Sequence, residues 1–178
     1  MPRKTKTYNL KEEAERIDTE LDEVAATVSN LEEGNPGRNE KVREGRQLER
    51  ELAGLQWALN PEEDEDREPY EEVTVGALTA AEYANASDRA SDAIGRQKGN
   101  SSSEWLRRLY FASAGVVSAP WLDEDDASFE DKLTETNQVA PQFLFWLESV
   151  VDEITTPRVE GNGFAQRVEA NLSGERPN

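Results

Sequence analysis

The chain of 178 residues contains neither cysteine nor histidine. Without cysteine it can form no disulfide and no thiolate metal site. Without histidine it lacks the side chain that most often serves as a general base, and the serines at 101–103 are not part of a G-x-S-x-G nucleophile motif. We therefore expect a protein that is not an enzyme and that needs no cofactor.

Long apolar runs are also missing. The longest stretch without a charged residue is Leu109–Leu122, which is shorter than the about 20 residues that cross a bilayer. The basic start MPRKTK is followed by the polar run TYNLKEEAER, where a signal peptide would need an apolar core. These features predict a soluble, cytoplasmic protein that does not bind membranes.

Basic residues are few. The chain has 38 acidic and 20 basic residues, which gives a net charge of −18, and arginine (14) outnumbers lysine (6). One interpretation is adaptation to a very salty cytoplasm, where molar salt screens charge repulsion beyond about 3 Å. The other is imitation of a nucleic-acid backbone. The even spread of the acids and the scarcity of lysine favour salt adaptation. The sequence has no basic patch that would indicate binding to nucleic acid. The two arginines of WLRRLY (105–110) are expected on the outer side of an amphipathic helix, which is their usual place.

The densest acidic cluster, DEDDASFED at 123–131, is the best candidate for a metal site. A calcium-binding loop that started at Asp123 would need glycine at its sixth position and glutamate at its twelfth. The chain has Ser128 and Thr134 at these positions. We therefore predict no metal site.

The N-terminal part has an apolar repeat typical of a coiled coil. Apolar residues recur alternately every four and three positions, which forms an a/d seam over three heptads. The seam consists of Leu10, Ala14, Ile17, Leu21, Val24, Val28 and Leu31. Asn9 and Glu12 match a capping box at its start, and Gly34, Pro36 and Gly37 are expected to end the helix.

A second amphipathic stretch with Val42, Leu48, Leu52, Leu55 and Leu59 on one face follows this break. The two stretches predict an antiparallel helical hairpin over residues 1–60. Such a hairpin either packs on a domain as a simple helical pair or engages a partner helix or a second copy of the chain.

The remainder of the chain predicts a small helical domain. The acidic, proline-flanked segment 61–71 is interpreted as a linker. Residues 72–157 are expected to form a helical domain that contains one short strand around Val73 and Val75, a helix opened by a Thr79–Glu82 capping box, and a last helix with Pro141 in its first turn. Residues 158–178 form a polar tail. The fold class is therefore mainly α, a hairpin plus a small helical domain with at most one short β element.

The order of motifs between residues 72 and 154 resembles that of the tail assembly chaperones of tailed viruses. An opening motif x-V-x-V-x-x-L-T-x-x-E-Y, a G-V-V-x-x-P exit from a hydrophobic helix, and a closing P-x-x-x-x-x-L-x-x-x-V-x-x-I helix follow one another. They are carried by Val73, Val75, Leu78, Thr79, Glu82, Tyr83, Gly115, Val116, Val117, Pro120, Pro141, Leu147, Val151 and Ile154. The N-terminal hairpin departs from shorter members of the family.

This resemblance implies a non-enzymatic chaperone that binds a helical tape-measure protein, helps to recruit tail-tube subunits, and is absent from the mature virion. It would act in the cytoplasm of a high-salt host. The motif positions and the aromatic content suggest five partner-binding residues: Leu78, Tyr83, Trp121, Phe143 and Trp146. The alternative is a virion structural or connector protein that uses the hairpin for oligomerisation.

Overall fold

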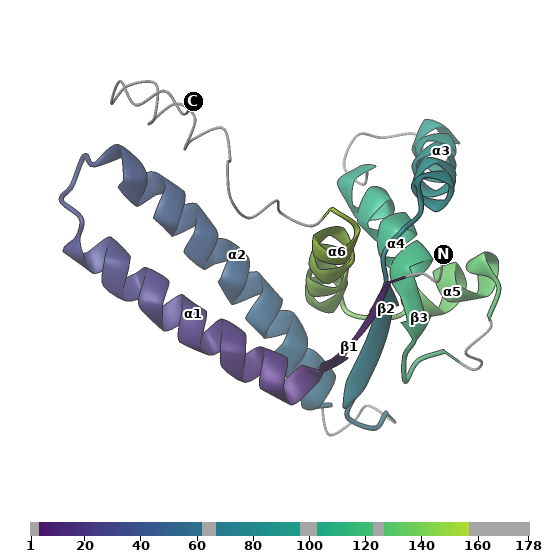
Figure 1. Cartoon of the computed structure of the whole chain (residues 1–178), viewed down its shortest axis with the longest axis horizontal. Coiled ribbons are helices and arrows are strands. Elements are labelled where there is room, and N and C mark those ends of the chain that lie inside the picture. Colours follow the sequence, from purple (N-terminus) through teal and green to yellow (C-terminus); the bar gives the residue numbers. More distant parts are fainter. Residues whose placement is uncertain (1–3, 62–66, 97–102, 123–126, 157–178) are drawn as a thin grey trace, which may run out of the picture.

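The computed structural model describes residues 4–61, 67–96, 103–122 and 127–156 (Figure 1). These residues form six helices and three strands. In chain order they are β1 (Thr5–Asn9), α1 (Leu10–Asn30), α2 (Pro36–Leu59), β2 (Glu72–Gly76), α3 (Ala80–Arg96), α4 (Ser103–Gly115), β3 (Val116–Ser118), α5 (Phe129–Thr136) and α6 (Pro141–Thr155). The predicted mainly α fold is confirmed. The polar tail, the middle of the acidic linker and the first four residues of the acidic cluster lie outside the described residues.

The helices α1 and α2 lie antiparallel and extend as an arm from the rest of the chain (Figure 1). Asn9 caps α1, because its side-chain oxygen accepts hydrogen bonds from the backbone N–H groups of Lys11 and Glu12, both at 3.1 Å. Gly34 reverses the chain with a φ of 98°, a left-handed conformation that favours glycine. Pro36 begins α2 instead of ending α1, since a first-turn residue needs no backbone N–H donor.

The three strands form one antiparallel sheet in the order β1-β2-β3. The predicted strand is β2, in which Val73 and Val75 are fully buried. Two further strands accompany it, where at most one short β element was expected. Their sequences carry no alternating pattern, because Tyr8 is the one buried side chain of β1 and β3 has three residues. Both strands form by pairing with β2, which is distant in sequence.

The helix α6 is the centre of the core and packs against α2, α4 and β2. Its wide apolar face is buried as predicted: Phe143, Leu144, Trp146, Leu147, Val150, Val151 and Ile154. Two neighbouring helices approach α6 through glycines. A Cβ atom at Gly54 of α2 would lie 2.4 Å from the carbonyl oxygen of Gln142, and one at Gly115 of α4 would lie 2.3 Å from Val151. These close approaches fix the positions of α2 and α4 on α6.

The predicted linker interrupts the sequence pattern but does not separate two cores. Tyr8, which precedes the hairpin, packs edge-on against Trp146 of α6 with ring centroids 5.7 Å apart. After the linker, the backbone N–H of Tyr70 donates to the carbonyl of Ala58 at 2.9 Å, and the Arg67 guanidinium lies 4.0 Å from the Trp57 ring. The base of the hairpin and the C-terminal helices therefore share one hydrophobic core.

Candidate partner-binding groove

Two of the five predicted partner-binding residues are core residues. Phe143 and Trp146 are fully buried, and their rings stack on each other with centroids 5.2 Å apart. The prediction is wrong for both, because α6 is covered by α2, α4 and the sheet and leaves its aromatic face no access to a partner. Their size serves packing.

Trp121 is half-buried and belongs to the same aromatic cluster. Its ring lies 5.4 Å from the rings of both Tyr70 and Phe143, and its indole N–H donates to the Thr136 hydroxyl at 3.2 Å. With its polar atom satisfied inside the molecule, Trp121 closes the edge of the core.

Leu78 and Tyr83 lie close together, but only Tyr83 is exposed, since Leu78 is 9% exposed and belongs to the core. They line a hollow of about 250 Å³ between α3, α4 and α6. Leu78 forms part of its apolar wall, while Tyr83 is 48% exposed and packs its ring on Phe111 with centroids 4.8 Å apart. This hollow can accept an apolar side chain.

A second hollow of about 380 Å³ adjoins the first at Glu104 and Arg108 and was not predicted. It is lined by Trp105 of α4, by Pro141, Gln142 and Phe145 of α6, and by Arg50 of α2 among others. Trp105 is 44% exposed, and together with Tyr83 it makes up the exposed large apolar side chains of the described residues. The sequence signal was present in WLRRLY, but amphipathic spacing alone does not say whether a neighbouring helix covers such a tryptophan.

Arg108 joins the two hollows. It lines both of them together with Glu104, and its guanidinium lies 4.4 Å from the Phe145 ring and 6.0 Å from the Trp105 ring. Ion pairs to Glu104 at 2.6 Å and to Glu148 at 2.5 Å hold it there. We call the surface formed by Tyr83, Trp105, Arg108, Phe111 and Phe145 the aromatic groove. It presents aromatic rings around a fixed cation.

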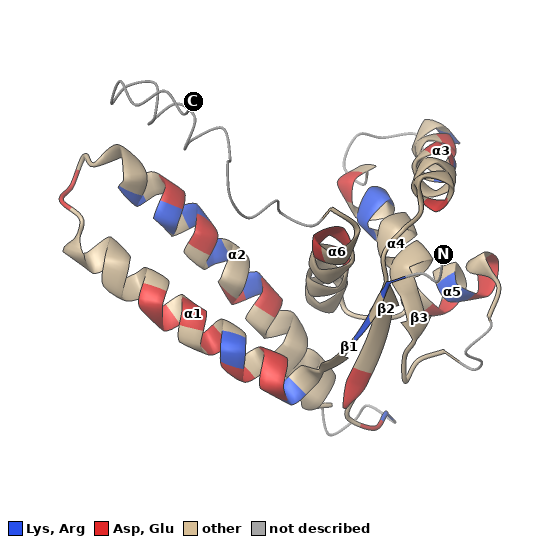
Figure 2. Cartoon of the chain, in the orientation of Figure 1, with Lys and Arg blue, Asp and Glu red and all other residues tan. Residues whose placement is uncertain are grey.

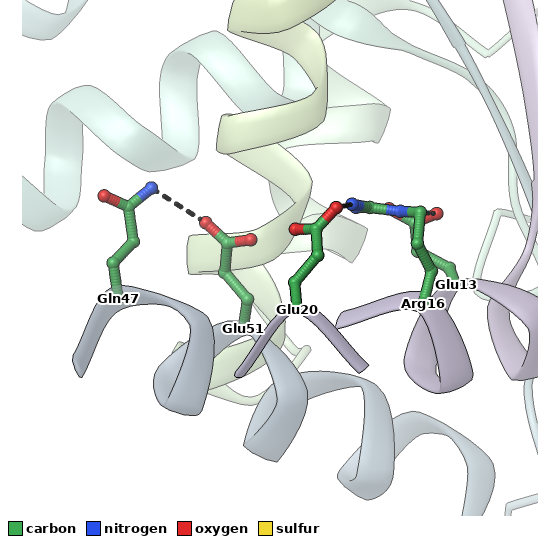
Figure 3. A network of polar contacts seen from close by, with 5 residues as sticks. All are labelled: Glu13, Arg16, Glu20, Gln47 and Glu51. Atoms are coloured by element: carbon green, nitrogen blue, oxygen red, sulfur yellow. Dashed lines mark hydrogen bonds and ion pairs between the residues drawn. The ribbon is translucent and has the colours of Figure 1, made fainter. Parts of the chain in front are cut away.

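A polar cleft of about 690 Å³ lies between the arm and α6. Figure 3 shows its network: Arg16 binds Glu13 at 2.6 Å and Glu20 at 2.5 Å along α1, and Gln47 donates to Glu51 at 3.0 Å along α2. All five side chains of this network come from the arm, and Arg16, Glu20, Gln47 and Glu51 line the cleft.

Burial perturbs the carboxylates of this region. Glu51 is 6% exposed, and desolvation raises its pKa against the opposing effect of hydrogen bonds from Gln47 and Ser149. Desolvation also raises the pKa of Glu148, although Arg108 opposes it. The hydrogen bond with Arg108 instead lowers the pKa of Glu104. The cleft between the arm and α6 thus contains two carboxyl groups, those of Glu51 and Glu148, whose pKa values are raised by burial.

Metal sites and membrane spans can be checked among the described residues. No group of three or more acidic side chains in this part of the chain is placed to hold a metal ion, and none of its helices is long and apolar enough to cross a membrane. Comparison with known proteins gives no match to a family model, a curated protein or a solved structure.

Proposed function

We propose that the protein is a non-enzymatic tail assembly chaperone that binds a helical segment of a tape-measure protein during virus tail morphogenesis in a high-salt host. The observation that supports this proposal best is the aromatic groove. It exposes Tyr83 of α3 and Trp105 of α4, each by more than 40%, on a strongly charged chain. Exposed aromatic residues of this kind are enriched where proteins bind partners.

The dimensions of the groove suit side chains projecting from a helix. Its two hollows of about 250 and 380 Å³ adjoin along α4, so that apolar residues one or two turns apart on a partner helix can enter both. A long helical protein with apolar stripes aggregates when those stripes are exposed, and a very acidic binding partner keeps the complex soluble.

The test is a purification of the tagged chain from virus-producing cells in molar salt, with partners identified by mass spectrometry. We expect a long, heptad-rich protein and tail-tube subunits to copurify, and finished particles to lack the chain. A variant with both Tyr83→Ala and Trp105→Ala should lose the long partner while keeping its own fold, because both side chains are exposed. Recovery of whole particles, or of capsid and portal subunits, would overturn the proposal.

The second candidate function, a virion structural or connector protein, is favoured by one feature of the arm. The last third of α1, from Val24 to its end, carries no charged side chain (Figure 2), and residues 24–31 read VAATVSNL in a chain of which 33% is charged. Leu21, Val28 and Leu31 are half-buried there. Permanent association of two arms through this surface would give a fixed copy number in particles, which the same purification measures.

A further inference from the structure

Arginines line the approach to the aromatic groove. Arg43, Arg46 and Arg50 are exposed and are spaced three and four residues apart, so they lie on one face of α2 that runs about 10 Å toward the tip of the arm. Arg50 also lines the larger hollow, with its guanidinium 6.0 Å from the Phe145 ring. Arg107 lines the smaller hollow.

These arginines differ from others in the same region. Arg16 and Arg108 each bind two carboxylates. Among the described residues, no carboxylate lies within ion-pair distance of Arg43, Arg46, Arg50 or Arg107. A chain with 38 acidic residues could readily pair these cations internally. Instead Arg50 and Arg107 line the hollows beside the exposed aromatic rings, and Arg43 and Arg46 continue from Arg50 along α2.

The helix α2 is nearly neutral, in contrast to the strongly acidic chain as a whole. Its 24 residues hold five basic and four acidic side chains, whereas α1 holds two basic and seven acidic ones (Figure 2). The helix α2 thus presents a local surface without negative excess on a molecule of net charge −18. A partner with carboxylates finds its complementary charges along this face.

We propose that the aromatic groove and the Arg43–Arg46–Arg50 face together bind an acidic amphipathic helix. Its apolar residues enter the hollows beside Trp105 and Tyr83, and carboxylates flanking its apolar stripe pair with Arg50 and Arg107. The arginines along α2 contact acids one and two turns further on. This inference rests on the proposed helix-binding function and adds the chemistry of the partner helix.

Binding of an acidic helix by an acidic protein has a distinct salt dependence. At 0.1 M salt the Debye length is about 10 Å, so the net charge of −18 repels an acidic partner. At 1 M salt the Debye length is about 3 Å, and this repulsion is largely screened. Apolar burial and close ion pairs are weakened much less by salt than this long-range repulsion. Affinity should therefore rise between 0.1 and 1 M salt, opposite to the usual effect of salt on charged complexes.

The test uses two synthetic peptides of about 20 residues that share one leucine and tryptophan stripe at helical spacing. One peptide carries glutamate on both flanks of the stripe and the other carries lysine. Their binding to the full chain is measured by fluorescence anisotropy in 0.1, 0.5 and 1 M KCl. We expect the glutamate peptide to bind with a Kd below about 1 mM in 1 M KCl, at least tenfold tighter than the lysine peptide.

Matched variants locate the interaction. Arg46→Glu with Arg50→Glu changes the net charge by −4 at the proposed face, and Lys11→Glu with Arg96→Glu changes it equally at exposed positions elsewhere. The first pair should weaken the glutamate peptide at least tenfold in 1 M KCl, and the second should leave its affinity unchanged. Trp105→Ala should weaken both peptides, since it removes an apolar contact.

The outcomes separate this inference from the proposed function. Preference for the lysine peptide, or equal loss in both variant pairs, would overturn the acidic partner and leave helix binding intact. Tighter binding of a single-stranded oligonucleotide than of the glutamate peptide would overturn the choice of a protein partner, because arginines and aromatic rings also bind bases. Failure of both peptides to bind would overturn the groove as a helix-binding surface.

Discussion

At the scale of single residues, Ser113 of α4 combines complete burial with an unused hydroxyl group. Its Oγ atom has no hydrogen-bond partner among the described residues. An unsatisfied buried hydroxyl costs free energy, and alanine is also the better helix former. We expect Ser113→Ala to raise the free energy of unfolding by about 1–2 kcal/mol, measured by urea denaturation.

The matched control for this change is Ser91→Ala in α3. Ser91 is exposed and its hydroxyl donates to the Ser87 carbonyl at 2.8 Å, so the control reports helix propensity and the loss of an exposed hydrogen bond. A gain at Ser113 no larger than that at Ser91 would show that the buried hydroxyl is satisfied after all.

Glu51 gives the stability of the fold a pH dependence of known sign. Burial raises its pKa above the usual value of 4.5, so the folded state retains its proton at pH values where the unfolded state has lost it. The contribution of Glu51 to stability is therefore lost as the pH rises from about 4.5 through the higher folded-state value.

Glu51→Gln should consequently raise the free energy of unfolding at pH 7, and this gain should shrink toward zero below pH 4.5. The amide can still accept from Gln47 and donate to Ser149. Urea denaturation across this pH range measures the effect, with the exposed neighbour substitution Glu49→Gln as control. A loss of stability at pH 7 would mean that Arg16 stabilises the carboxylate more than burial destabilises it.

At the scale of elements, the contact between α4 and α6 depends on Gly115. A Cβ atom there would lie 2.3 and 2.4 Å from the two methyl carbons of Val151. Gly115→Ala should therefore cost about 1–3 kcal/mol of stability through overpacking. In a Val151→Ala background the two closest contacts disappear and only the Cβ of residue 151, at 2.9 Å, still crowds the new methyl group, so the added cost should be smaller. An equal cost in both backgrounds, measured by urea denaturation, would contradict this contact.

Elements with local signals could be predicted from the sequence. Asn9 caps α1, Thr79 and Glu82 exchange the hydrogen bonds of a capping box at 2.8 and 3.2 Å, and Pro141 lies in the first turn of α6. Each of these signals acts within a few residues of the chain. The strands β1 and β3 have no such signal, because their hydrogen bonds depend on a partner more than 40 residues away.

The candidate groove could be predicted only in part, because the exposure of a side chain depends on contacts with elements that are distant in sequence. The motif position Tyr83 does lie at the surface, but Leu78, Phe143 and Trp146 are buried while Trp105 is exposed. Amphipathic spacing identifies the apolar face of a helix and leaves open what covers that face. In α6 the cover is α2, α4 and β2, and around Trp105 the described residues leave it partly open.

At the scale of the whole molecule, the charge of −18 is unevenly placed. The helix α1 has an excess of five acidic residues, and Glu15, Asp18 and Asp22 are exposed on it. Self-repulsion of this kind destabilises a compact state at low ionic strength and is screened by salt. The fold should therefore be more stable in 2 M than in 0.1 M KCl, with the melting temperature rising about 2–4 °C for each kcal/mol of repulsion relieved.

The matched variant for this prediction carries Glu15→Gln, Asp18→Asn and Asp22→Asn, which remove three charges from α1 without touching a buried residue. Its melting temperature should exceed that of the original chain in 0.1 M KCl, and the two should converge in 2 M KCl, because the salt then screens the repulsion that the substitutions remove. A salt-independent difference, measured by circular dichroism, would assign the gain to local helix propensity. An unchanged melting temperature of the original chain across this range would contradict salt adaptation as the cause of its acidic composition.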